Sequence, residues 1–204
     1  MERTVRPAGP RDAPAAAALL AAAFIDDPVM DWIQPVRSQR TPLLKRLFAV
    51  QLSHEYLPAG GVRVIDSPDG QPLAAAMWKP PTIATVGGTR REQISMAAAL
   101  VAALRTRLPA ALVVRRALDS AHPTEPHWYL NKIGTAPSAR GQGLASALLS
   151  AQVRHCDETS RPAYLECTRQ TLIGFYEQFG FTATESIVIS DGGPRVWGMW
   201  RPPG

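Results

Sequence analysis

The stretch "IGTAPSARGQGLASALLSAQ", residues 133–152, decides how the second half of this chain folds. A strand-like start breaks at Gly134, a polar turn follows, and two glycines flank Gln142 before an unbroken Ala/Leu/Ser helical pattern. Glycine lets the backbone approach a ligand closely, and the first N–H groups of a helix are unpaired. Their partial positive charge favours phosphate, and Arg140 adds a guanidinium at the same place. The pattern predicts either a phosphate site or a helix that begins with glycines for tight packing, and the glycines alone leave both open.

Length and composition predict a single compact α/β domain. The chain has 204 residues, of which 46% are hydrophobic and 19% charged, an ordinary balance for a soluble globular protein with a core. The net charge of +5 suits an anionic ligand. The arginine pairs at 90–91 and 115–116 lack the density of a nucleic-acid-binding arm, so we expect no nucleic-acid partner.

The cysteines and the apolar segments bear on the cellular compartment. Cys156 and Cys167 have no metal-ligand spacing, so we expect two reduced thiols, no metal and a cytoplasmic protein. The segment "RDAPAAAALLAAAFIDDP" imitates a signal peptide, but Asp12 as a cap and Pro14 in the first turn predict a helix start instead. No run approaches the ~20 apolar residues of a membrane span, so we expect no membrane partner.

The remaining pattern predicts alternating short elements. We expect strands over 4–9, 127–135 and 163–168, a hairpin over 61–80 around Ser-Pro-Asp-Gly, two terminal strands, and helices over 12–25, 41–57, 89–107, 109–119, 140–157 and 171–180. Thr41 is the expected cap of the second helix, with Pro42 at its first position. Crossover helices between strands imply one parallel pair in an otherwise antiparallel sheet. The predicted fold class is therefore α/β, with a mixed, mostly antiparallel central sheet and flanking helices.

Two common phosphate-binding loops do not fit residues 140–145. A nucleoside-triphosphate loop needs Gly-Lys-Ser/Thr, whereas Leu144 and Ala145 follow Gly143. A dinucleotide-binding loop needs a third glycine, which this loop lacks.

Two motifs resemble those of the Gcn5-related N-acetyltransferase (GNAT) family. "APSARGQGLASALL" is similar to the acetyl-coenzyme A (acetyl-CoA) signature Arg/Gln-x-x-Gly-x-Gly/Ala, filled by Arg140, Gly143 and Ala145. "LECTRQTLIGFYEQFGF" is similar to the second motif, in the same order and spacing. Segments along nearly the whole chain, among them "LAAAFIDDPVMDW" and "GGPRVWGMWRPPG", resemble the puromycin N-acetyltransferase-like group, which associates the chain with antibiotic resistance.

The resemblance implies a GNAT domain over 1–204, with a splayed parallel strand pair, acetyl-CoA as co-substrate and no metal. Residues 1–126 would mainly form the acceptor side, and 127–204 the acetyl-CoA-binding core. The backbone of 133–135 would pair with the pantetheine arm, and the N–H groups of 141–146 would bind the pyrophosphate. Relatives commonly carry Asn where this chain has Leu172, with Thr171 beside it. The residues assigned to acetyl-CoA are Ile133, Gly134, Thr135, Arg140, Gly141, Gln142, Gly143, Leu144, Ala145, Ser146, Thr171 and Phe175.

Two residues are candidates for proton transfer. The resemblance implies that Tyr176 is the general acid that protonates the departing thiolate, and the alternative is an aromatic side chain packed on the sheet. Glu166, at a strand end, is our candidate base; it is equally well interpreted as a carboxylate that pairs with Arg169. No cysteine has the context of a nucleophile, so we expect direct transfer in a ternary complex.

The acceptor is expected to be a primary amine of a small molecule, such as a puromycin-like aminoacyl nucleoside. An α-amino group near pKa ~7.7–8 is already substantially neutral, unlike a lysine amine near ~10.4. Carboxylates and indoles suit such a cation; the candidates are Asp26, Asp27, Met30, Trp32 and Trp78, with Asp31 in the same loop. Asp26 and Asp27 are alternatively simple helix caps. The other functions left open are a protein or peptide N-acetyltransferase and a non-catalytic coenzyme-A sensor, and the assembly is a monomer or homodimer.

Overall fold

The computed structural model describes residues 4–81, 90–190 and 192–204. In these ranges seven strands form one sheet in the order β1-β2-β3-β4-β5-β7-β6. The strands are β1 (Val5–Pro7), β2 (Val62–Asp66), β3 (Pro72–Lys79), β4 (Trp128–Thr135), β5 (Ala163–Cys167), β6 (Thr182–Val188) and β7 (Arg195–Arg201). The α-helices are α1 (Ala13–Ala23), α2 (Pro28–Ile33), α3 (Arg37–Gln51), α4 (Arg90–Leu104), α5 (Leu108–Ala121), α6 (Leu144–Glu158) and α7 (Ile173–Glu177).

The parallel pair is short, and this creates a split in the sheet. β4 and β5 pair through Trp128–Ala163, Tyr129–Tyr164 and Leu130–Leu165. Beyond these pairs β4 continues beside β3, and β5 continues beside β7, so the two strands diverge. The other strand pairs are antiparallel. The predicted fold class, with one splayed parallel pair, is confirmed.

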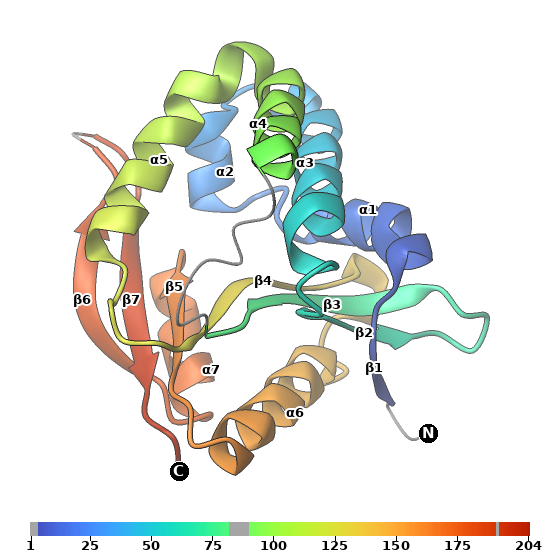
Figure 1. Cartoon of the computed structure of the whole chain (residues 1–204), viewed down its shortest axis with the longest axis vertical. Coiled ribbons are helices and arrows are strands. Elements are labelled where there is room, and N and C mark those ends of the chain that lie inside the picture. The colour runs from blue at the N-terminus through green and yellow to red at the C-terminus, as the bar shows by residue number, and fades with distance from the viewer. Residues whose placement is uncertain (1–3, 82–89, 191) are drawn as a thin grey trace.

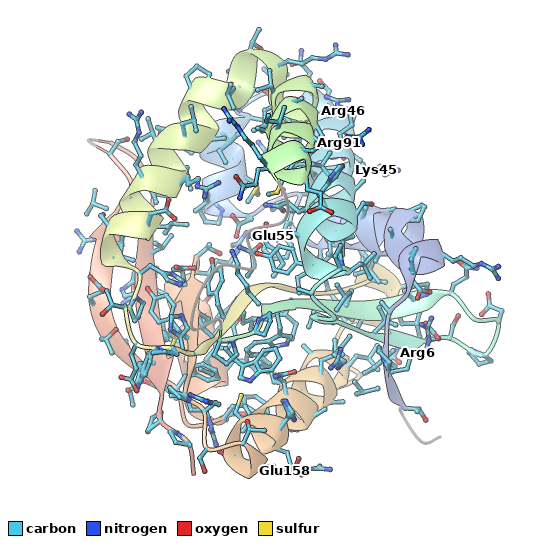
Figure 2. All side chains as sticks on the ribbon, viewed as in Figure 1. Arg6, Lys45, Arg46, Glu55, Arg91 and Glu158 are labelled. Carbon is cyan, nitrogen blue, oxygen red and sulfur yellow. The ribbon has the colours of Figure 1, made fainter. Side chains whose placement is uncertain are left out.

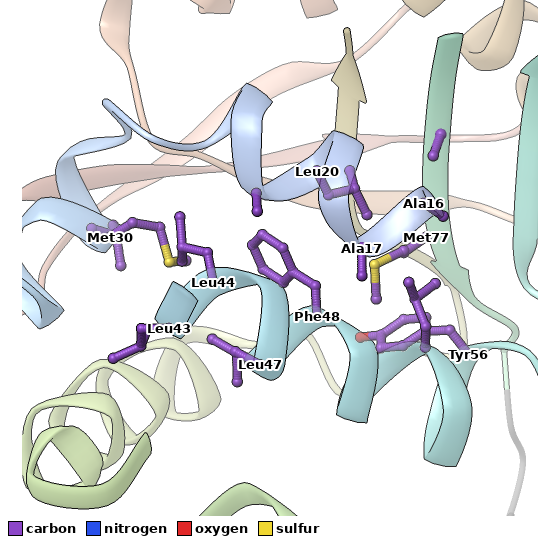
Figure 3. Packing of buried hydrophobic residues seen from close by; sticks show 14 of the residues in the cluster. Ala16, Ala17, Leu20, Met30, Leu43, Leu44, Leu47, Phe48, Tyr56 and Met77 are labelled. Carbon is purple, nitrogen blue, oxygen red and sulfur yellow. The ribbon is translucent and has the colours of Figure 1, made fainter. Parts of the chain in front are cut away.

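Helices cover the two faces of the sheet unequally (Figure 1). α1 and α3 lie on one face, where Leu20, Leu44 and Phe48 are completely buried (Figure 3). α6 crosses the other face, where Leu148 and Leu149 are completely buried. Truncation of a core side chain as large as Phe48 to alanine costs about 3–5 kcal/mol, so these buried side chains contribute strongly to the stability of both layers.

The start of α3 and the whole of α2 differ from the sequence prediction. α3 begins at Arg37, so Pro42 lies inside the helix and Thr41 is not its cap. The buried Arg40 explains the earlier start, because its guanidinium donates to the carbonyls of Gln34 (2.9 Å) and Ile25 (2.6 Å). α2 was predicted as a loop, but Asp27 caps it through the N–H groups of the first turn.

The stretch Arg90–Ala121, which holds α4 and α5, is long and apolar enough to cross a membrane by length and composition alone. We expected no membrane span from the sequence, because no unbroken run approaches ~20 apolar residues. Only 17% of its most apolar window is buried. A 3₁₀ turn over Arg105–Arg107, with φ of +50° at Arg105, divides it into two helices. The helix predicted over 89–107 begins at residue 89, which lies outside the described residues.

Candidate active site

A cavity of about 410 Å³ opens where β4 and β5 separate. Its walls come from the divergent ends of both strands, from the loop before α6, from α7, and from α1, α2 and α5 on the opposite side. Among the described residues, no strand pairs with this side of β4 beyond Leu130, so its peptide groups border the opening.

The glycine loop forms one end of this opening. Gly141 and Gly143 both have φ of +73°, in the left-handed region that glycine adopts readily. A Cβ on Gly141 would meet nothing within 4 Å, so this glycine is required for its backbone conformation and not for space. α6 begins directly afterwards at Leu144, which leaves its first N–H groups without helical partners. A second cavity of about 310 Å³ lies here, lined by Thr135, Arg140, Gly141, Gly143, Leu144, Ala145 and Ser146 among others.

Gly134 has a different role from the loop glycines. A Cβ at this position would lie 2.7 Å from the Cβ of Ala23 and 3.2 Å from a methyl of Leu20. β4 therefore approaches α1 as closely as a glycine allows. The side of β4 away from β3 stays open along residues 133–135, which line the main cavity. An extended amide-containing arm could pair with this edge as an additional strand does.

Tyr176 lies on α7 and lines the main cavity. It is buried, and burial raises the pKa of its hydroxyl above its ordinary value, with smaller contributions from Cys167 and Asp27. Its ring packs edge-on against Phe175, at 5.3 Å between centroids. A phenol in this setting stays protonated at neutral pH, which is the state that a proton donor needs.

Glu166 lies on β5, one residue beyond the last pair with β4, and lines the same cavity. The hydroxyl of Tyr129 donates to its Oε2 at 2.6 Å, and Asn131 donates to the same hydroxyl at 3.1 Å. Its carboxylate is only 6% exposed. Arg169 donates instead to the carbonyl of Asp26, so Glu166 is held by a phenol and not by this arginine. A nearly dry carboxylate beside an acceptor cavity has the position of a general base.

The acceptor candidates divide into two groups. Asp27 and Met30 line the main cavity. Asp27 Oδ1 accepts from the N–H groups of Val29 (3.0 Å) and Met30 (3.1 Å), and its Oδ2 accepts from Thr168. Its carboxylate is thus a helix cap that also ties α2 to the end of β5.

The other acceptor candidates lie away from the described cavity lining. Asp26 is exposed and pairs with Arg37, and Asp31 pairs with the buried Arg40. Trp32 packs against the core around α1 and α3. Trp78 is completely buried in the core on the α6 side. Neighbouring residues of a strand face opposite sides, so Trp78 points away from the acceptor side.

Two residues assigned to acetyl-CoA also lie outside the described linings. Gln142 and Thr171 are exposed and border neither cavity in the described part of the chain. Leu172, where relatives commonly carry Asn, does line the main cavity and is 39% exposed.

Several lining residues were not found from the sequence. Val114 and Leu118 of α5 roof the acceptor side, and α5 itself contacts α2 and β6. Lys132 of β4 also lines this cavity. Its amine donates to the backbone oxygen (3.0 Å) and side-chain oxygen (3.2 Å) of Asn131. Burial lowers the pKa of Lys132. The only sequence signal for the roof was the apolar i, i+4 pair on α5, which is typical of any helix that packs on a core.

With this geometry established, the matches to known proteins become informative. A sequence model described as an acetyltransferase (GNAT) domain matches residues 97–183, which include the split strands, the glycine loop and α7. This part of the chain is therefore similar to GNAT acetyltransferase domains. A curated relative, an uncharacterized N-acetyltransferase of Schizosaccharomyces pombe, is 30% identical over 69 residues; the match covers 34% of this chain and only 28% of that protein.

Solved structures agree with the GNAT fold. A protein from Corynebacterium glutamicum described as histone acetyltransferase HPA2 and related acetyltransferase is 27% identical, with a TM-score of 0.73 and coverage of 100% of this chain and 98% of that one. Arylalkylamine N-acetyltransferase 2 of Aedes aegypti is 14% identical, with a TM-score of 0.67 over 100% of both chains. Polyamine N-acetyltransferase of Drosophila melanogaster is 14% identical, with a TM-score of 0.65 over 98% and 100%. Together the comparisons support an N-acetyltransferase.

Proposed function

We propose that this protein transfers the acetyl group of acetyl-CoA directly to the primary amine of a small molecule. One observation carries the proposal. The open edge of β4, Glu166 and Tyr176 all border the main cavity, and Arg140 and Ala145 line both this cavity and the second one at the left-handed glycine loop. A donor with a phosphate and an extended amide arm fits the glycine loop and the strand edge (the donor end), and an amine fits the remaining part of the main cavity (the acceptor end).

The residues of the donor end suit acetyl-CoA. The N–H groups at the start of α6 and the guanidinium of Arg140 suit its pyrophosphate. The open edge of β4 at residues 133–135 suits the amides of its pantetheine arm. Gly134 allows this part of β4 to lie close against α1.

Two protons move in the proposed reaction. The amine nitrogen forms a bond to the thioester carbonyl carbon, and the carbon–sulfur bond breaks. Glu166 removes a proton from the amine, and Tyr176 gives a proton to the departing thiolate. The hydroxyl of Tyr129 holds the carboxylate of Glu166 in place by a 2.6 Å hydrogen bond. The pKa of Tyr129 is raised by burial and by Glu166, which keeps this phenol protonated as a donor.

The acceptor end favours a small amine with an apolar body. Phe24, Met30, Val114 and Leu118 form its apolar lining, and α5, which carries the last two, contacts both α2 and β6. An α-amino group near pKa ~7.7–8 needs little help to become neutral, so an aminoacyl nucleoside of the puromycin type is the acceptor we propose first.

A protein or peptide amine is the second candidate. The similar protein of Corynebacterium glutamicum is described as a histone acetyltransferase HPA2 and related acetyltransferase, which favours a protein acceptor. The roof formed by α5 favours the small molecule. A coenzyme-A sensor without turnover would not need both Glu166 and Tyr176 beside one cavity.

The test is a screen with purified protein, acetyl-CoA and four amines: puromycin, 2-phenylethylamine, agmatine and a histone-tail peptide, with released thiol as the readout. We expect the aromatic small amines to give the highest kcat/KM. We expect Tyr176→Phe to lower kcat by about 10²-fold with little change in acetyl-CoA affinity. Phe179→Leu, which changes an aromatic side chain outside the cavity lining, is the matched control. Fastest turnover of the peptide would overturn the small-molecule acceptor, and undiminished turnover by Tyr176→Phe would overturn its role as acid.

A further inference from the structure

Two histidines lie behind Glu166, on the side away from the acetyl-CoA loop. His122 follows the last residue of α5, and His127 precedes β4. The Nδ1 atom of His122 is 3.5 Å from Oε1 of Glu166. The Nε2 atoms of the two histidines are 3.2 Å apart. Glu166, His122 and His127 therefore form a row that leads out of the cavity.

The tautomers of this row follow from the hydrogen bonds. His127 Nδ1 is 2.6 Å from the carbonyl oxygen of Glu125, which can only accept, so Nδ1 carries the proton. His127 is buried, and burial lowers its pKa, so the ring is neutral and its Nε2 is an acceptor. His122 must then donate from its own Nε2. In the neutral form of His122, Nδ1 is then left with a lone pair that faces Glu166.

This leaves two acceptors facing each other. Oε1 of Glu166 is buried and makes no hydrogen bond within the described residues, although Nδ1 of His122 is at 3.5 Å. One added proton would convert this contact into an O–H···N hydrogen bond. The proton that Glu166 takes from the amine can serve as this added proton. The side chain of His122 is 33% exposed, whereas that of Glu166 is 6% exposed. Of the two, His122 is therefore the one that can exchange a proton with solvent.

We propose that His122 takes from Glu166 the proton removed from the amine and releases it to solvent, with His127 as the positioning residue that fixes its tautomer. This rests on the role of Glu166 proposed above. The proton moves from the amine nitrogen to Oε1 of Glu166, then to Nδ1 of His122, and finally to water or buffer. Glu166 thereby returns to its charged state for the next turnover without direct contact with water.

The surroundings hold the rings in place. The ring of His122 packs edge-on against Tyr129 (4.8 Å between centroids) and Tyr164 (5.2 Å). His127 packs against Tyr164 and, from β7, Trp200. The charged or titratable groups that face the two histidines are Glu166, Tyr129 and Tyr164. The charge of Glu185 acts on Tyr164, and the charge of Glu125 raises the pKa of His127.

The first test measures the tautomers directly and needs no substrate. The chain has four histidines, so long-range proton–nitrogen NMR spectra can resolve each ring, with His54 and His155 as internal references. We expect a proton on Nδ1 of His127 and on Nε2 of His122. In His127→Phe we expect His122 to become a mixture of tautomers. A proton on Nδ1 of His122 in the wild type would overturn the proposal.

The second test is kinetic, with puromycin and 2-phenylethylamine as the acceptor probes. His122→Phe keeps the ring contacts and removes both nitrogens; we expect kcat to fall about 10- to 100-fold, while the KM for acetyl-CoA changes less than about twofold. In His122→Ala, added imidazole should restore part of kcat, which a merely structural role would not allow. His155→Phe, whose ring packs on Trp128 (5.4 Å between centroids), is the control.

The outcomes separate the two proposals. Undiminished kcat in His122→Phe at every pH, in an active enzyme, overturns the relay and leaves the acetyltransferase intact. A wild type that acetylates none of the amines overturns the proposed function itself, and the NMR tautomers then still decide the role of His127.

Discussion

The two ends of the cavity are built by different means. The donor end consists of backbone: an open strand edge, two left-handed glycines and the start of α6. The acceptor end consists of side chains from α1, α2, α5 and β4, which are far apart in the sequence. A backbone site needs particular residue types at fixed spacing, whereas a side-chain wall needs only apolar volume. The donor end therefore depends on a sequence motif, and the acceptor end depends on the volume of its side chains. Substitutions at the donor end should change the binding of acetyl-CoA, and substitutions at the acceptor end should change the binding of the amine.

The largest effect is expected where the two ends meet. Glu166→Gln keeps the volume and a hydrogen-bonding group for Tyr129 but cannot accept the amine proton. We expect kcat with puromycin to fall about 10²- to 10⁴-fold, with acetyl-CoA affinity unchanged by calorimetry. Glu185→Gln, on β6, is the control. A loss of acetyl-CoA affinity in Glu166→Gln would mean that the two ends are not separable.

The donor end should be sensitive to backbone conformation. Gly143→Val places a β-branched residue at φ of +73°, which costs about 1–2 kcal/mol in the left-handed region. We expect acetyl-CoA to bind about 5- to 30-fold more weakly in calorimetry, because the loop must rearrange. Gly70→Val introduces the same strain at φ of +78° in the β2–β3 turn. It should lower stability without changing the affinity, and equal affinity losses in both variants would contradict a specific loop.

The acceptor end should be sensitive to volume. Leu118→Ala opens the apolar roof, and the loss of part of a buried leucine is worth about 1–2 kcal/mol of contact. We expect the KM for puromycin to rise about 5- to 30-fold, while the KM for acetyl-CoA stays constant. Leu112→Ala, at a leucine that is 41% exposed on the same helix, should change neither. If the histone-tail peptide became the better substrate only in Leu118→Ala, the roof would be the element that selects small amines.

The smallest effect is expected far from both ends. Arg6 on β1 (Figure 2) donates to Asp12 and Asp66, and its hydrogen bond lowers the pKa of Asp12 to about 2. A lowered folded-state pKa stabilises the protein above the unfolded value near ~4, and this contribution is lost as the pH falls toward ~2. Arg6 is 36% exposed, so we expect Arg6→Gln to cost about 1 kcal/mol or less at neutral pH.

Urea unfolding at several pH values checks this prediction. The difference between wild type and Arg6→Gln should shrink between about pH 4 and pH 2, as Asp12 becomes protonated in both. The kcat of the variant should equal that of the wild type. A difference that stays constant down to the lowest pH would show that Asp12 is not the partner that matters.

The comparison also explains what could be predicted from the sequence. The sheet, its parallel pair, the 61–80 hairpin and the glycine loop were predicted from local patterns. Glu166 was a candidate because of its place at a strand end, and Tyr176 was a candidate because of the resemblance to the GNAT family. The errors lie where tertiary contacts override local signals. Arg40 moved the start of α3, and Trp78 faces the α6 side of the sheet. The partners of Glu166 could not be predicted, because Tyr129 and His122 come from other elements and carry no motif.

The brevity of the parallel pairing has a consequence for cooperativity. Three residue pairs join β4 to β5, and beyond them the two strands are not paired with each other. A donor arm that pairs with residues 133–135 would supply part of the hydrogen bonding that the chain itself omits. The occupied enzyme is then a more complete sheet than the empty one. Saturation at 100 times Kd would add about 2.7 kcal/mol to its stability, and the slowing of amide exchange should be concentrated along this seam.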